Sequence, residues 1–251
     1  MPLDTQRIGV LLRHNLILVG RDPGHLIAYI VMPMVLMLLE APLYRAAMRG
    51  SLGTTQVVTG MLVMFSLLAL SIVGYAVLTE RTWQTWDRLR ATPAAPLELL
   101  IGKAGTILAV LVAQQAALLG FGAGVLGLRV PGAKAMGLLC LAVLCWGVTL
   151  LAGGSALGLA VRSPGQLSAI SDIAGLVLTG LGGALAPLSA MPGWARVAAP
   201  VSPGYWAMAA LRAALSGDTV GTLRAVGVLL ALAGVAAGYA CWRVSRTRTR
   251  L

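Results

Sequence analysis

The chain has 251 residues, of which 58% are hydrophobic and only 11% are charged, and its mean hydropathy is +0.87. Soluble domains carry about 25% charged residues, so the few polar groups here cannot cover a water-facing surface. The net charge of +11 does not indicate binding to nucleic acid, because the arginines are scattered between apolar runs and form no basic face. The composition therefore predicts an all-α integral membrane protein.

The first predicted element is an N-terminal interfacial helix at residues 5–20. Its apolar face is formed by Ile8, Leu11, Leu12, Leu16 and Val19. A helix of this kind lies on the cytoplasmic leaflet, although a plain cytoplasmic lead-in also fits these residues. Arg7, Arg13 and His14 interrupt the apolar run, and no small-residue cleavage site follows it, so we expect no cleaved signal peptide.

Six apolar segments follow that are long enough to cross the hydrocarbon core, which takes about 20 helical residues. They are residues 26–44, 56–79, 104–128, 136–161, 168–188 and 222–242. Helices are expected because lipid offers the backbone no hydrogen-bond partners. We therefore predict a single transmembrane domain over residues 1–251 with six transmembrane helices.

The basic residues predict the orientation of these spans. With the N-terminus inside, twelve lysines and arginines fall in inside segments and seven in outside segments. Because basic residues favour the cytoplasmic side, we expect both termini in the cytoplasm and the chain in the inner, cytoplasmic membrane. The basic tail after Trp242 either binds anionic headgroups or serves only as a stop-transfer anchor.

Between spans two and three, residues 80–103 form a dense polar segment. Residues 80–91 contain neither proline nor glycine, so a helix of about three turns is expected, and Pro93 and Pro96 end it. Its apolar stripe is formed by Trp83, Trp86 and Leu89. On the residues alone, this short cytoplasmic helix either lies on the lipid surface or binds another protein through its aromatics and arginines.

The segment "ERTWQTWDRLRATPAAPLELLIGK" resembles the coupling segment of type-2 ABC exporter permeases, the group that contains the daunorubicin-resistance permeases. The family pattern is roughly E-R-E-x-G-T-L-E-R-L-x-A-T-P, then an apolar stretch and G-K. The matches are Glu80, Arg81, Thr85, Arg88, Leu89, Ala91, Thr92, Pro93, Gly102 and Lys103, with Asp87 a conservative replacement. Thr82, Gln84 and Trp86 depart from the pattern. The resemblance favours protein binding and implies ATPase-coupling roles for Glu80, Arg81, Trp83, Trp86, Asp87, Arg88, Leu89 and Arg90.

A second stretch, "GALAPLSAMPGWARVAAPVSPGYWAMAALRAAL" at residues 183–215, resembles the passage before the last span of the same family. The matches are Pro187, Ser189, Pro192, Trp194, Pro203, Tyr205 and Arg212, whereas Ser202 stands where the family usually has Asn. The resemblance implies an extracytoplasmic or re-entrant segment at residues 187–220.

The resemblance further implies the membrane half of an exporter whose ATPase is a separate chain. The sequence supports this, because it contains no G-x-x-x-x-G-K-[ST] phosphate loop. We expect no cofactor on this chain, with ATP and Mg on the partner ATPase. The expected partners are two ATPase copies, a second permease (identical or related) and the lipid bilayer, but no nucleic acid.

The transported solute is expected to be hydrophobic or amphiphilic (a drug, antibiotic or lipid), because the spans are apolar and lack an ion filter. Candidate polar residues along the pathway are Glu40, Gln114, Gln115 and Asp172. No catalytic or metal-binding motif is present in the sequence, so an enzyme is not expected. The family implies efflux and antibiotic resistance, and the Lys-poor composition indicates a bacterial source. A non-transporting scaffold or sensor subunit that recruits an ABC ATPase is the alternative function.

Overall fold

The computed structural model describes residues 24–48, 50–82 and 96–248. These residues form helices and no strands. The helices are α2 (Gly24–Ala47), α3 (Ser51–Leu68), α4 (Leu70–Thr82), α6 (Pro96–Gly124), α7 (Gly132–Ala160), α8 (Pro164–Leu181), α9 (Gly193–Ala198), α10 (Pro203–Leu215) and α11 (Thr219–Arg248), with 3-10 turns η1 (Leu188–Ala190) and η2 (Ala199–Val201). The predicted interfacial helix at 5–20 and coupling helix at 80–91 lie mostly or wholly outside the described residues.

Within the described residues, five helical stretches are long and apolar enough to cross a membrane: Ile27–Ala47, Ser51–Thr79, Ala104–Gly124, Gly132–Ala160 and Thr219–Arg246. They confirm five of the six predicted spans. The remaining segment, 168–188, largely coincides with α8, which is not one of the five. Gln166, Ser171 and Asp172 lie in the first half of α8 and lower its hydropathy, so its role as a span stays a prediction.

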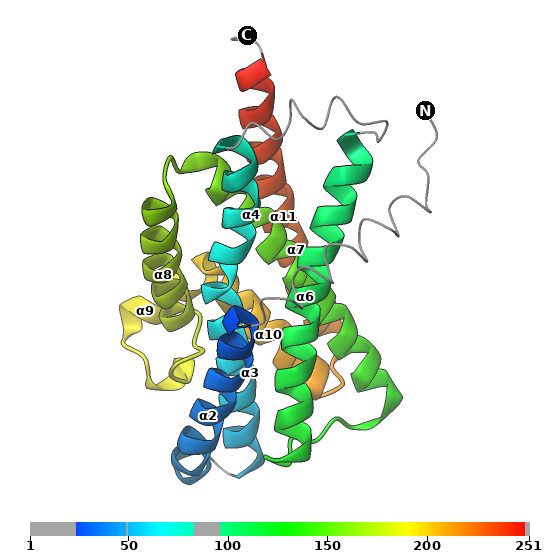
Figure 1. Ribbon diagram of the computed structural model, residues 1–251. Coiled ribbons are helices and arrows are strands. Elements are labelled where there is room, and N and C mark those ends of the chain that lie inside the picture. Colours follow the sequence, from blue (N-terminus) through cyan, green and yellow to red (C-terminus); the bar gives the residue numbers. More distant parts are fainter. Residues whose placement is uncertain (1–23, 49, 83–95, 249–251) are drawn as a thin grey trace.

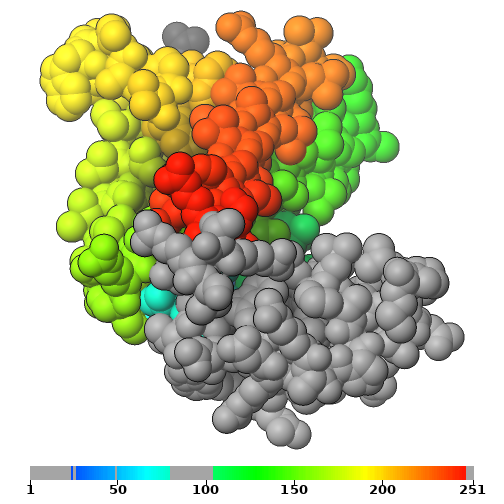
Figure 2. Space-filling model, turned by 90° about the horizontal axis from the view of Figure 1, so that it is seen from above, coloured from blue at the N-terminus to red at the C-terminus, as the bar shows by residue number. Residues whose placement is uncertain are grey.

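The long helices alternate in direction (Figure 1). The C-terminal ends of α4 and α11 and the N-terminal ends of α6 and α8 lie at one end of the bundle, at the top of Figure 1. The α2–α3 turn and the α6–α7 loop lie at the opposite end. Seen from the top, the last turns of α11 reach the surface (Figure 2). This alternation is the arrangement expected of consecutive membrane-crossing helices.

The core lies where α3, α7, α10 and α11 pack together. Trp146 of α7, Leu62 of α3, Leu211 of α10 and Leu229 of α11 are among its buried side chains. By contrast, α2 presents an exposed apolar surface that includes Met32, Leu39 and Leu43. Large exposed apolar side chains on long helices are what a lipid-facing surface requires.

The segment at 187–220 folds as short helices, of which α10 packs into the bundle. Ser202 begins α10 by accepting a hydrogen bond from the Gly204 N–H at 3.1 Å, and its hydroxyl donates to the Leu178 carbonyl of α8 at 2.6 Å. Serine and asparagine are both favourable N-caps. The departure from the family's Asn therefore preserves the cap of α10 and adds a tie to α8. The extracytoplasmic or re-entrant location of the segment stays a prediction.

Candidate functional site

The predicted coupling segment joins α4 to α6 at the end of the bundle where α11 finishes (Figure 1). Glu80 and Arg81 belong to the last turn of α4, but their side chains are not among those described. The other predicted coupling residues, namely Trp83, Trp86, Asp87, Arg88, Leu89 and Arg90, lie outside the described residues. The described helices therefore fix where the segment is attached, and its contacts stay a prediction.

The second span is interrupted at Ala69, between α3 and α4. The Ile72 N–H donates to the Ala69 carbonyl at 3.0 Å, an i to i−3 bond of the 3-10 type. The Leu68 carbonyl accepts from the Ser71 hydroxyl at 3.1 Å, and such side-chain bonds bend helices. The part of the span after Ala69, α4, leads directly into the coupling segment.

Helix α4 lies unusually close to α7, because glycines stand at the contact. A Cβ added to Gly154 would come 2.5 Å from the Val73 Cβ, and one added to Gly158 would come 2.5 Å from the Gly74 carbonyl oxygen. Gly154 and Gly158 stand four residues apart, the spacing of small residues that lets membrane helices approach closely. Gly234 and Gly238 have the same spacing, but a Cβ at either would meet no atom within 4 Å, so this pair makes no close helix contact among the described residues.

At the far end of α8, the loop 182–186 is held by polar groups from two other helices. The Gln56 amide of α3 donates to the Gly183 carbonyl at 2.9 Å and to the Ala184 carbonyl at 3.4 Å. The Arg212 guanidinium of α10 donates to the Gln56 side-chain oxygen and, at 3.4 Å, to the Gly183 carbonyl. We call this set, Gln56, Gly183, Ala184 and Arg212, the polar latch.

Further contacts hold the same loop. The Tyr44 hydroxyl of α2 donates to the Leu185 carbonyl. A Cβ on Gly60 of α3 would collide with the Ala184 carbonyl oxygen, so the loop lies directly on α3. Gly183 adopts a φ of +78°, a conformation that glycine alone adopts readily. The loop after α8 is therefore held by contacts with α2, α3 and α10.

We expect Arg212→Ala to destabilise the fold, because it leaves the Gln56 side-chain oxygen without its donor in a buried site; Gln56 is only 2% exposed. The cost is about 1–3 kcal/mol, and a chain of this size loses about 2–4 °C in melting temperature per kcal/mol. Thermal unfolding in detergent micelles measures it. The control is Arg196→Ala, since Arg196 of α9 is exposed. Equal melting temperatures for Arg212→Ala and Arg196→Ala would contradict the latch.

Two of the predicted pathway residues, Gln114 and Gln115, are buried on α6. Gln114 donates to the Tyr29 carbonyl of α2 at 3.1 Å. Pro33, four residues after Tyr29, has no N–H for that carbonyl, so Gln114 supplies a donor where the helix lacks one. Gln115 donates to the Leu111 carbonyl at 3.2 Å, and its side-chain oxygen has no partner among the described residues.

The structure does not bring the other two pathway candidates to these glutamines. Glu40 is partly buried on α2, and Asp172 is exposed on α8. No hydrogen bond or ion pair joins either carboxylate to Gln114 or Gln115 in the described parts of the chain. The four residues therefore form no common cluster there, and their role in transport stays a prediction.

The C-terminal end of α11 carries an aromatic and basic cluster, which is typical of a membrane–water interface. The Arg246 guanidinium carbon lies 4.3 Å from the centre of the Trp242 ring, and Tyr239 packs beside Trp242 at 6.0 Å between ring centres. Arg243 donates to the Leu159 carbonyl at the end of α7, at 3.3 Å. The ends of α7 and α11 are thus tied together beside the attachment points of the coupling segment.

Residues suited to a metal ion do not gather in the described structure: no group of three His, Cys, Asp or Glu side chains occurs there. The cysteines Cys140, Cys145 and Cys241 are free thiols.

The model of the ABC-2 type transporter family matches residues 6–216, a range that includes the coupling segment, the polar latch and five of the six predicted spans. No curated protein matches the chain. The family match confirms the type-2 ABC permease resemblance seen in the sequence, while the likeness to daunorubicin-resistance permeases stays a prediction. Together with the five membrane-length helices, the match shows that this multi-pass membrane protein belongs to the ABC-2 type transporter family.

Proposed function

We propose that the chain is the permease subunit of an ABC exporter and moves a hydrophobic or amphiphilic solute with energy from a separate ATPase subunit. ABC-2 permeases normally work with an ABC ATPase partner. The observation that carries the proposal is the attachment of the coupling segment to α4, a rod separated from α3 at Ala69 and in close contact with α7. A movement of the ATPase bound to this segment would be transmitted to the spans through α4.

The proposed orientation places both termini and the coupling segment in the cytoplasm and the chain in the cytoplasmic membrane of a bacterium. Arg243 and Arg246 at the end of α11 support this placement, because basic residues near span ends favour the cytoplasmic side. The α2–α3 turn, the α6–α7 loop and the polar latch then belong to the outer half of the protein.

In the proposed mechanism, two permeases pair, and each binds one ATPase through its coupling segment. ATP and Mg bind to the ATPases and draw them together, and α4 moves with them against α7. The change in the spans is limited by how differently nucleotide binds the two states of the assembly. Glu80, Arg81, Asp87, Arg88 and Arg90 would set the register of the ATPase contact, and Trp83, Trp86 and Leu89 would anchor it.

The proposed solute class follows from the apolar character of the spans. The buried polar side chains of the described interior are neutral, such as Gln115, Thr149 and Ser171. An apolar interior with neutral polar groups suits a drug, antibiotic or lipid better than an ion. Efflux and antibiotic resistance would be the physiological result.

The test is to identify the ABC ATPase that co-purifies with the full chain from its native membranes, reconstitute both in vesicles and measure hydrolysis and transport. We expect amphiphilic solutes to stimulate ATP hydrolysis and to accumulate across the vesicle membrane only when both chains and ATP are present. Tight ATPase binding with neither stimulation nor transport would instead support the non-transporting scaffold or sensor. Failure to bind any ABC ATPase would contradict both functions.

A further inference from the structure

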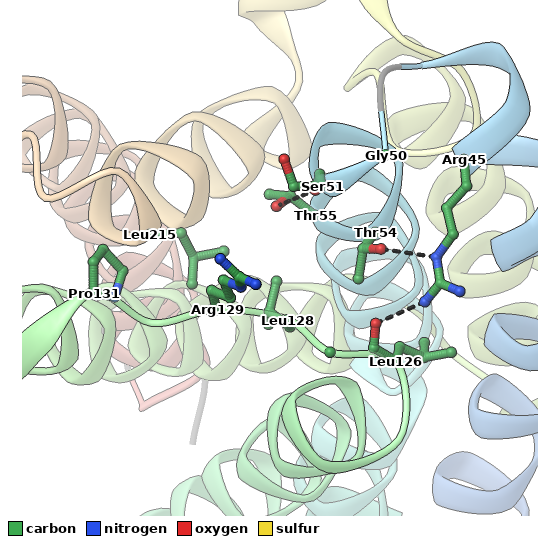
Figure 3. A pocket seen from close by; sticks show the side chains of 11 residues that line it. Arg45, Gly50, Ser51, Thr54, Thr55, Leu126, Leu128, Arg129, Pro131 and Leu215 are labelled. Carbon is green, nitrogen blue, oxygen red and sulfur yellow. Dashed lines mark hydrogen bonds between the residues drawn. The ribbon is translucent and has the colours of Figure 1, made fainter.

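A pocket of about 720 Å³ opens at the end of the bundle opposite the C-terminus, between the end of α2, the start of α3 and the α6–α7 loop. Figure 3 shows its two arginines, Arg45 and Arg129, with Leu128 between them in the view. Its volume is that of a site for a small molecule or a lipid headgroup.

The polar residues that line the pocket carry basic and hydroxyl groups. Arg45 is held in place, because its Nε donates to the Thr54 hydroxyl at 3.0 Å and its Nη2 donates to the Leu126 carbonyl at 2.7 Å. Its Nη1 makes no hydrogen bond within the described residues. Arg129 is exposed, and its guanidinium has no hydrogen-bond or ion-pair partner among them.

No carboxylate is among the residues that line the pocket. Asp218, the first acidic residue after α10, does not line the pocket. Its carboxylate accepts a hydrogen bond from the Gly221 N–H in the first turn of α11 at 3.0 Å. Moreover, the sequence has no Asp or Glu at residues 41–79 or 99–171, which supply most of this end of the bundle. The lining thus carries two positive charges and no negative one, and Glu40, five residues before Arg45 on α2, is not part of it.

Apolar side chains line the pocket too. Leu126, Leu128 and Leu215 lie among the arginines (Figure 3), and the exposed side chains of Leu43 and Leu52 lie on the neighbouring turns of α2 and α3. A site that combines arginines and hydroxyls with leucines matches a molecule with an anionic head and an apolar tail. Free inorganic phosphate would use only the polar groups of the site.

The charge is also unusual for its location. Under the proposed orientation, Arg45 and Arg129 fall in short outer segments, where basic residues are disfavoured. We propose that this pocket binds the phosphate group of an anionic amphiphile, such as an outer-leaflet lipid or a phosphate-bearing solute. The binding itself needs no ATPase, so it is testable independently of the function proposed above; only the side of the membrane rests on that proposal.

The test uses the purified full chain in a neutral detergent, mixed with equal amounts of phosphatidylglycerol and phosphatidylcholine of the same acyl chains. Native mass spectrometry counts the lipid retained. Phosphatidylcholine carries a choline that neutralises its phosphate, so we expect the wild type to retain phosphatidylglycerol in preference. Arg129→Gln should lower that preference about fivefold, the effect of one basic residue near an anionic lipid. The matched control is Arg196→Gln, which removes an exposed arginine outside the pocket.

Equal retention of the two lipids by the wild type would overturn the proposal, as would an equal loss in Arg129→Gln and Arg196→Gln, which would show an effect of net charge alone. A third arm adds millimolar inorganic phosphate. If phosphate alone displaces the lipid, the site takes a free anion and the amphiphile is wrong. Because Arg129 makes no contact that supports the fold, Arg129→Gln should melt at the wild-type temperature, and retention should fall with added salt.

Discussion

Replacing Trp83 and Trp86 with alanine and Arg88 with glutamate should release the ATPase from the permease and stop ATP-driven transport. Buried tryptophans at protein interfaces each contribute about 2 kcal/mol or more, and the reversed charge adds repulsion. The ATPase should therefore bind about a thousandfold more weakly or worse. Co-purification from membranes measures the binding, and solute uptake into vesicles measures the transport.

The control for this variant is Arg162→Glu. Arg162 follows α7, is exposed and lies on the same predicted cytoplasmic face between spans four and five. Its reversal changes the net charge by the same amount without touching the coupling segment, so binding and transport should remain normal. If the ATPase stays bound to the triple variant and transport continues at the wild-type rate, the proposed role of the coupling segment in binding the ATPase is wrong.

Substituting alanine for Gly158 should destabilise the fold, although alanine is the better helix former by about 1 kcal/mol. The new Cβ would come 2.5 Å from the Gly74 carbonyl oxygen and 3.1 Å from the Val77 Cβ. Because backbone and a β-branched side chain cannot yield easily, α4 must shift away from α7, at a cost of about 1–3 kcal/mol. The melting temperature in micelles should fall, and coupled transport should fall with it.

Gly234→Ala in α11 is the matched control, since a Cβ there meets no atom within 4 Å. Helix propensity favours alanine at both positions, and packing opposes it at only one. We therefore expect opposite signs: Gly158→Ala lowers the melting temperature, and Gly234→Ala leaves it unchanged or raises it. Two variants of equal stability would show that α4 and α7 are not held at this distance.

The spans were predictable because membrane helices obey a local rule: about 20 apolar residues between polar boundaries. Five stretches satisfy it in both the sequence and the structure. α8 tests the limit of that rule: the sequence predicts a span at residues 168–188, whereas α8, with Gln166, Ser171 and Asp172 in its first half, is not among the five. Hydropathy thus identifies strongly apolar spans well and marginal ones poorly.

The contacts that join distant parts of the chain were not predictable from local patterns. Gln56 and Arg212 are 156 residues apart and meet only because α3 and α10 pack side by side. The family resemblance singled out Arg212, but it did not indicate which residue Arg212 contacts. Gly154 and Gly158 share their spacing with Gly234 and Gly238, yet only the first pair makes a close contact. The spacing of two glycines identifies a helix surface that permits close approach. Whether another helix packs against that surface depends on the tertiary fold.

The interruption at Ala69 was also hidden in the sequence, because neither proline nor glycine stands there. Ser71 is the residue that could have drawn attention to it, through its bond to the Leu68 carbonyl. The expected pathway role of Gln114 illustrates the same difficulty. A glutamine in an apolar span suggests a polar lining of a transport pathway. Gln114 instead donates to the Tyr29 carbonyl, which Pro33 of the same helix leaves without a backbone donor, and this contact between two helices is visible only in the three-dimensional structure.

The joint at Ala69 has a consequence for how such a protein keeps a membrane sealed. A straight second span would tilt as one rigid body, so that opening on one side of the membrane would always be accompanied by closing on the other side. In the proposed transport cycle, α4 would change its angle at Ala69 while α3 stays against α10 and the loop at Gly183. The two sides would then open in sequence, with a fully occluded state between them in which neither compartment has access to the solute.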